Sequence, residues 1–89
     1  MRVLAFFAAK QGVPSNVSYA SSSIRSTFNI SVENFDIESY EGKTACSTYG
    51  VSSFPAFVAV ANSGMILQKW QGGSAPTMDE LRYYIERNN

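Results

Sequence analysis

An uninterrupted apolar run near the start of the chain sets the strongest constraint on its fold. After Arg2, residues 3–9 contain only Val, Leu, Ala and Phe. A central strand buried on both faces of a sheet is predicted over residues 2–8. The run is too short to span a membrane. Its removal as a signal peptide would delete the best strand candidate, so we expect a cytoplasmic protein without a membrane partner.

Residues 15–37 have the pattern of a helix followed by that of a strand. Ser15 or Asn16 is the expected N-cap of a helix. Its apolar residues recur at spacings of three and four and form one stripe: Val17, Ala20, Ile24 and Phe28. A strand is predicted around residues 30–37. A strand, a helix and a strand in this order predict a right-handed crossover and a parallel pair.

The second half of the chain predicts two further strands. A short helix over residues 41–49 is expected to end at Gly50 in a left-handed C-cap. A third strand is predicted from Phe54 to Ala61, and the turn at residues 62–64 leads into an antiparallel fourth strand over residues 65–71.

The C-terminal residues predict a last helix. Thr77 and Glu80 have the spacing of a capping box, and Met78, Leu81 and Ile85 form an apolar stripe. The predicted order is β-α-β-(α)-β-β-α. It describes an α/β fold in which helices cover both faces of a four-stranded mixed sheet, in one domain over residues 1–89.

The composition excludes several kinds of chemistry. The chain has one cysteine and no histidine, so it cannot form an internal disulfide, a zinc site or a nucleophile activated by histidine. Its net charge is zero and only 16% of its residues are charged, which argues against nucleic acid as a partner. We therefore expect no catalytic residue, metal or cofactor.

Several segments resemble thioredoxin. Residues 49–57, Tyr-Gly-Val-Ser-Ser-Phe-Pro-Ala-Phe, are similar to the family's Tyr-Gly-Val-x-x-x-Pro-Thr segment. Residues 4–8 resemble the strand before the active-site loop, and residues 34–38 resemble the acidic end of the second parallel strand. The resemblance implies a thioredoxin-like fold that lacks the family's extra N-terminal strand and helix. It also implies a cis peptide bond before Pro55.

The family's redox residues are replaced. The loop Trp-Cys-Gly-Pro-Cys falls on residues 10–15 with one residue inserted, and its two thiols become Gln11 and Ser15. The family's buried aspartate falls on Ala5. Without thiolates there is no nucleophile for disulfide exchange. The resemblance therefore implies a redox-inactive module that binds a peptide or partner protein in a groove beside Pro55. The predicted groove residues are Gln11, Gly12, Pro14, Ser15, Val51, Phe54 and Pro55.

Two alternatives remain open from the sequence. The domain can be a structural subunit of a larger assembly, including a homodimer, with Trp70 as an interface anchor, although core packing of this tryptophan is favoured. It can also be a monothiol redox protein that uses Cys46, although this residue is more typical of a small core hydrophobe.

Overall fold

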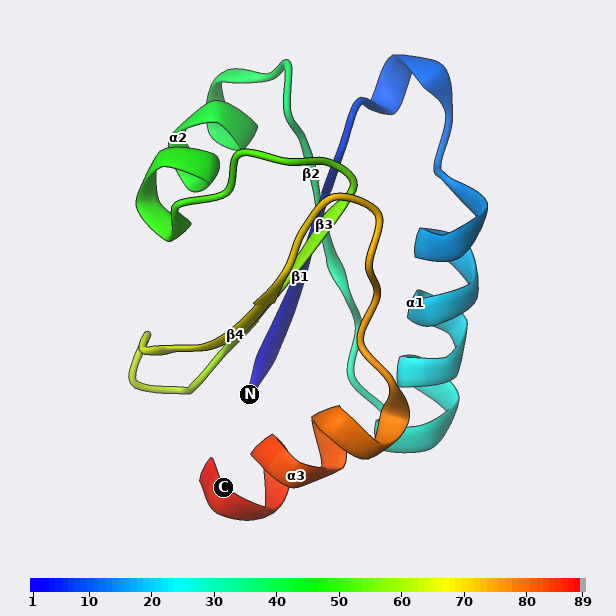
Figure 1. The fold of residues 1–89 in the computed structure, drawn as a ribbon, viewed down its shortest axis with the longest axis vertical. Coiled ribbons are helices and arrows are strands. Elements are labelled where there is room, and N and C mark those ends of the chain that lie inside the picture. Colours follow the sequence, from blue (N-terminus) through cyan, green and yellow to red (C-terminus); the bar gives the residue numbers. More distant parts are fainter. Residues whose placement is uncertain (89) are drawn as a thin grey trace.

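A computed structural model describes residues 1–88 of the chain (Figure 1). The elements are β1 (Arg2–Phe7), the 3-10 turn η1 (Ala9–Gln11), α1 (Ser15–Phe28), β2 (Glu33–Asp36), α2 (Tyr40–Tyr49), β3 (Ala56–Val60), β4 (Ile66–Trp70) and α3 (Met78–Asn88). The longest helix, α1, has 14 residues. Within residues 1–88, no helix is long and apolar enough to cross a membrane.

The four strands form one mixed sheet in the order β2-β1-β3-β4. Strand β1 is parallel to β2 and antiparallel to β3, and β3 is antiparallel to β4. The parallel crossover and the antiparallel last pair were both predicted and are confirmed. The two inner strands are buried on both faces, because residues 3–6 and 56–60 expose none of their surface. Residues 3–7 of the apolar run therefore lie in an inner strand of the sheet, and Ala8 and Ala9 follow it.

Helices cover both faces of the sheet, as predicted (Figure 1). On one face, Val17 and Ile24 of α1 and Leu81 of α3 pack with Phe57 in one apolar core. On the other face, α2 contributes Ala45 to a second core that contains Leu4, Phe6 and Val58. The alternation of side chains along β1 and β3 divides their residues between these two cores.

Strand β2 is shorter than the predicted strand over residues 30–37. Its four residues pair with β1 from Leu4↔Glu33 to Phe7↔Asp36, and β1 ends at Phe7. Ile30 lies before the strand and packs with its neighbour Val32 against the core below α1 and α3. The apolar pattern predicts a longer strand because it does not distinguish residues that pair in the sheet from residues that pack against the core before it.

Two of the three helix N-termini are capped by side chains. The Ser39 hydroxyl accepts a hydrogen bond from the Gly42 N–H at the start of α2, and Thr77 and Glu80 form the predicted capping box on α3. The predicted cap on α1 is wrong. Pro14 occupies the N-cap position without a side-chain hydrogen bond, and Ser15 is already helical. Helix α2 ends in the predicted left-handed C-cap, with a φ of 67° at Gly50.

Candidate functional site

A hollow of about 360 Å³ opens at the end of the sheet where β1 passes into η1. We call it the proline hollow, because Pro55 lies in its wall. Its lining comes from three segments that are far apart in the sequence: Phe7, Ala8, Gln11, Gly12 and Pro14; Ile37; and Phe54 and Pro55. None of these eight residues carries a charge.

The ends of β1 and β2 are held together beneath this hollow. The Ile37 N–H donates to the Phe7 carbonyl at 3.1 Å. The Asp36 carboxylate accepts hydrogen bonds from the backbone N–H groups of Ala9 at 3.3 Å and Glu38 at 3.1 Å. Asp36 therefore ties the start of η1 to the end of β2. Because Asp36 holds these two segments together, Ile37 lines the same hollow as Gln11 and Gly12.

The segment before β3 is fixed by residues that follow β4. The Gln71 side-chain oxygen accepts hydrogen bonds from the N–H groups of Ser52 at 2.9 Å and Ser53 at 3.3 Å. The Gly73 N–H donates to the Pro55 carbonyl at 3.0 Å. The Phe54–Pro55 peptide bond, which follows Ser53, is cis. Phe54 and Pro55, which form one wall of the hollow, therefore belong to a loop that three hydrogen bonds tie to residues 71–73.

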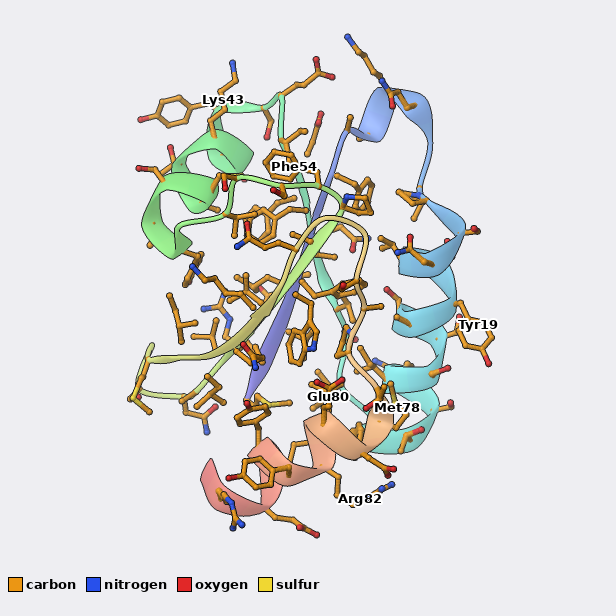
Figure 2. All side chains as sticks on the ribbon, viewed as in Figure 1. Tyr19, Lys43, Phe54, Met78, Glu80 and Arg82 are labelled. Carbon is orange, nitrogen blue, oxygen red and sulfur yellow. The ribbon has the colours of Figure 1, made fainter. Side chains whose placement is uncertain are left out.

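Phe54 presents both an apolar side chain and free backbone groups at this wall. Its side chain lies near the end of the sheet (Figure 2), and the residue is 38% exposed. Within residues 1–88, neither its N–H nor its carbonyl has a hydrogen-bond partner. An exposed segment with an unpaired backbone N–H and carbonyl can pair with the backbone of a partner peptide.

Five of the seven predicted groove residues line the proline hollow: Gln11, Gly12, Pro14, Phe54 and Pro55. The other two do not. Val51 is only 6% exposed and packs in the core beside α2, so it offers no surface to a partner. Ser15 lines a second hollow on the far side of Pro14.

Sequence reasoning missed three residues of the lining. Phe7 is the last residue of the first strand, Ala8 follows it, and Ile37 follows the second strand. The signal was available, since parallel strands end at the same edge of a sheet and their last residues lie side by side there. The predicted groove residues all fall within the two segments that resemble family motifs, residues 10–15 and 49–57, and the three missed residues lie outside both.

Trp70 is not an exposed anchor. The residue is 7% exposed and belongs to the core below α1 and α3. Its indole Nε1 donates to the Glu80 carboxylate at 3.2 Å, which satisfies the one polar atom of a side chain that is otherwise buried. The assembly-subunit hypothesis therefore loses the residue that was expected to anchor it.

Cys46 lies away from the proline hollow, on α2. It is half-buried and packs against the core on the α2 side of the sheet. Burial raises the pKa of its thiol above the usual value, because a low-polarity environment disfavours the thiolate. Less of the reactive form is present at neutral pH, which fits the expectation that Cys46 is a small core residue.

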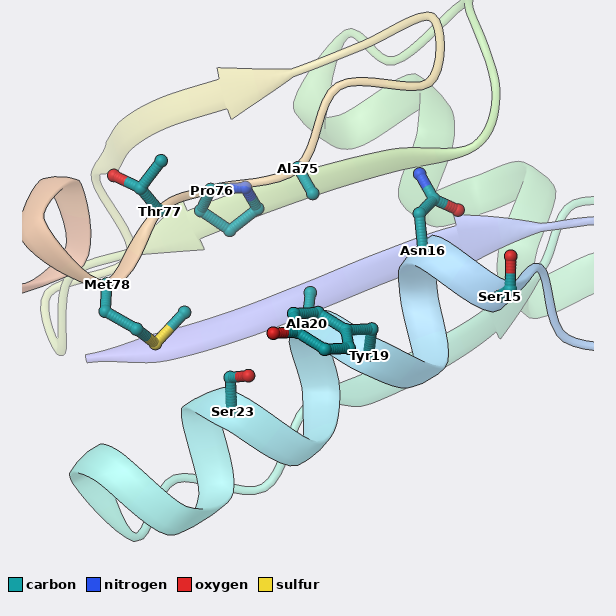
Figure 3. A pocket seen from close by; sticks show the side chains of 9 residues that line it. All are labelled: Ser15, Asn16, Tyr19, Ala20, Ser23, Ala75, Pro76, Thr77 and Met78. Carbon is teal, nitrogen blue, oxygen red and sulfur yellow. The ribbon is translucent and has the colours of Figure 1, made fainter.

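The second hollow is the larger of the two, at about 660 Å³ (Figure 3). We call it the helix hollow, because it lies between α1 and the segment that leads into α3. Its lining is Ser15, Asn16, Tyr19, Ala20, Ser23, Ala75, Pro76, Thr77 and Met78. No sequence motif pointed to it, since its two walls are more than 50 residues apart.

The fold is similar to that of solved thioredoxins. Thioredoxin 1 from the thermophilic eubacterium Thermosipho africanus matches with a TM-score of 0.65 and 18% identity over 98% of this chain and 92% of that chain. Thioredoxin O2 from Arabidopsis thaliana in its oxidised state matches with a TM-score of 0.67 and 17% identity over 97% of this chain and 72% of that chain. A malarial protein matches with a TM-score of 0.66 and 17% identity over 97% of this chain and 93% of that chain. Neither a family model nor a curated protein sequence matches.

The chain therefore has a thioredoxin-like fold, and the prediction of this fold is confirmed. At 17–18% identity the likeness carries the fold alone. One fold supports many functions, so the function has to be argued from the site.

Proposed function

We propose that this chain is a redox-inactive binding module that docks an extended segment of a partner peptide or protein in the proline hollow. The observation that carries the proposal is the exposed Phe54 with its unpaired N–H and carbonyl beside an uncharged hollow. Backbone pairing of this kind supplies affinity that depends little on sequence, while a pocket for an alternate side chain supplies selectivity.

The lining of the hollow indicates the chemistry of the docked side chain. Gln11 is its only side chain with hydrogen-bonding groups, and the other lining residues are apolar or glycine. The charged groups near the hollow already have partners: Lys10 and Glu38 form an ion pair with each other at 3.1 Å, and the Asp36 carboxylate accepts hydrogen bonds from two backbone N–H groups. A charged side chain entering the hollow would lose water without gaining a counter-charge. The proposed occupant is therefore an uncharged apolar side chain.

The absence of a dithiol supports a binding role rather than disulfide exchange. Gln11 and Ser15 occupy the places that resemble the family's two thiols, and they lie on different hollows. The one thiol of these 89 residues, Cys46, is on α2. Disulfide exchange needs an accessible thiolate at the site where the partner binds.

The direct test is an NMR titration of nitrogen-labelled protein with a short peptide of Ser, Thr and Gln that has one central Leu. We expect the amide signals of Gln11, Gly12 and Phe54 to shift, with a Kd on the order of 1 mM. The same peptide with Asp in place of Leu is the matched ligand control and is expected to bind at least about fivefold more weakly.

Two variants locate the binding. Phe54→Ala removes the exposed wall and is expected to weaken binding about fivefold or more. Tyr40→Ala truncates an exposed aromatic residue on α2, outside the hollow, and is expected to leave binding unchanged. A titration in which the three amide signals stay in place would overturn the proposal.

The monothiol alternative has a separate test. A chromogenic thiol reagent is expected to label Cys46 in the folded protein much more slowly than in urea, because burial raises the pKa of the thiol and limits access. Equal labelling rates in the two states would instead favour a reactive thiol at this position.

A further inference from the structure

The helix hollow lies directly beside the proline hollow. Pro14 lines the proline hollow, and the next residue, Ser15, lines the helix hollow. Figure 3 shows Ser15 and Asn16 at one end of the helix hollow and Met78 and Ser23 toward the other, so it extends along α1 away from the proline hollow. The two hollows are therefore consecutive along the start of α1.

The boundary between the two hollows is held by hydrogen bonds. The Asn16 side-chain amide donates to the Gly73 carbonyl at 2.9 Å. The Gly73 N–H in turn donates to the Pro55 carbonyl at 3.0 Å. Gly73 therefore connects Asn16, in the first turn of α1, to Pro55 in the wall of the proline hollow. These two hydrogen bonds hold the two hollows in a fixed relative position.

The helix hollow is uncharged like the proline hollow, but five of its lining side chains have hydrogen-bonding groups where the proline hollow has one. Among its nine lining residues none is charged. Ala20, Ala75 and Pro76 supply an apolar floor, and Met78 supplies a flexible apolar wall. Tyr19 borders the hollow while projecting from α1, with 79% of its surface exposed (Figure 2). Such a site favours an uncharged apolar side chain, because a charge would be desolvated there without a partner.

We infer that the helix hollow is a second subsite of the same peptide, which receives another uncharged apolar side chain while the first occupies the proline hollow. The inference rests on the proposed function. Side chains of an extended chain alternate between its two faces. A peptide with both side chains on the face toward the protein must therefore place them an even number of residues apart.

The test compares three short peptides of Ser, Thr and Gln in the NMR titration. One has a single Leu, one has two Leu residues four positions apart, and one has two Leu residues three positions apart. We expect the even spacing to bind about fivefold to tenfold more tightly than the single Leu, with added shifts at the amides of Tyr19 and Met78. The odd spacing is expected to give no such gain.

Variants separate this inference from the proposed function. Tyr19→Ala removes an exposed wall of the helix hollow and is expected to abolish the gain from the second Leu without changing the affinity of the single-Leu peptide. Tyr40→Ala is the matched control and keeps the gain. Tyr40 is similarly exposed, at 85%, but lies on α2.

Each alternative outcome is decisive. Binding of the single-Leu peptide at Gln11 and Phe54 without a gain from the second Leu overturns the inference and leaves the proposed function intact. No binding of any peptide overturns both. Shifts at Tyr19 and Met78 that appear on raising the protein concentration, without peptide, assign the helix hollow to a second copy of the chain and also overturn the inference.

Discussion

Helices α1 and α3 pack against the same face of the sheet, but their sequences specify them in different ways. Helix α3 begins with a reciprocal cap, in which the Thr77 N–H donates to the Glu80 carboxylate at 3.0 Å and the Glu80 N–H donates to the Thr77 hydroxyl at 3.1 Å. Helix α1 follows Pro14 without a side-chain cap, and six of its 14 residues are serine, a residue of modest helix propensity.

The candidate site takes part of its shape from α1, the helix that its own sequence specifies less strongly. Helix α1 borders both hollows, since Pro14 and Ser15 stand at its start and Tyr19 on its exposed side. Its own sequence supports it weakly, so its position depends on three buried residues: Val17, Ala20 and Ile24. A helix shorter than about 12–15 residues is marginal by itself in water, and packing of its apolar face supplies most of its stability in a protein.

The largest effect is expected from Ile24→Ala. Ile24 exposes none of its surface and lies in the stripe that holds α1. We expect the free energy of unfolding to fall by about 2–5 kcal/mol in urea titrations. Ile24→Val is the milder variant, with an expected loss of about 0.5–1.5 kcal/mol. If both variants lost less than about 0.5 kcal/mol, the packing of Ile24 would not be what holds α1 against the sheet.

The caps provide the next test. Thr77→Ala removes the hydroxyl that caps α3 and is expected to lower the free energy of unfolding by about 1 kcal/mol. Ser15→Ala is the matched change at the start of α1, where the serine hydroxyl caps nothing, and is expected to change stability by less than about 0.5 kcal/mol. If both variants lowered the free energy of unfolding equally, the side-chain cap of α3 would not distinguish it from α1.

The pH dependence of α3 gives a smaller effect. Hydrogen bonds from the Thr77 backbone, and from the Trp70 indole, hold the pKa of the Glu80 carboxyl below its usual value of 4.5. The stabilisation is therefore present above that usual value and is lost as the pH falls through the lowered pKa of the folded state. Because the side chain is exposed, we expect a loss smaller than that from Thr77→Ala.

Glu80→Gln tests this assignment because glutamine does not titrate. Its single amide oxygen can keep only one of the two hydrogen bonds that the carboxylate accepts from Thr77 and Trp70, so we expect a lower stability at neutral pH and compare only the pH dependence. Urea titrations from neutral pH down to acidic pH are expected to show a weaker decline in stability for the variant than for the original protein. An identical decline in both proteins would show that other carboxyl groups account for it.

The smallest effect is expected on the exposed face of α1. Ser18 and Ser22 are exposed and helical, so Ser18→Ala and Ser22→Ala are each expected to raise the free energy of unfolding by about 0.3–0.5 kcal/mol through helix propensity. Thermal unfolding of the double variant measures the sum. A decrease in stability would show that one of these hydroxyls makes a contact that matters more than propensity.

Much of the fold was predictable from the sequence. Alternation and apolar runs located the four strands, and the spacing of Val17, Ala20 and Ile24 located α1 with its buried face. The start of β2 was not predictable, because Ile30 and Val32 continue the apolar pattern of the strand but pack against the core before it. The favoured core packing of Trp70 is confirmed, but the local sequence did not indicate its hydrogen-bond partner, the Glu80 carboxylate ten positions away.

The candidate site was predictable only in part. Gln11, Gly12, Pro14, Phe54 and Pro55 were found because they fall on segments that resemble a known motif. The helix hollow had no motif, because it is formed where the start of α1 meets residues 75–78. Side-chain type and spacing report on contacts within a few residues, and this hollow depends on contacts across most of the chain.

The sequence by itself determined the buried central strands, the capped start of α3 and the lack of a second thiol. The strands follow from short apolar runs, the cap follows from the spacing of Thr77 and Glu80, and the lack of a second thiol follows from the composition. Only the tertiary structure decided that Val51 faces the core, that Ser15 borders a different hollow from Gln11, and that two uncharged hollows meet at the start of α1. These outcomes depend on strand register and helix packing, which bring together side chains that no local pattern relates.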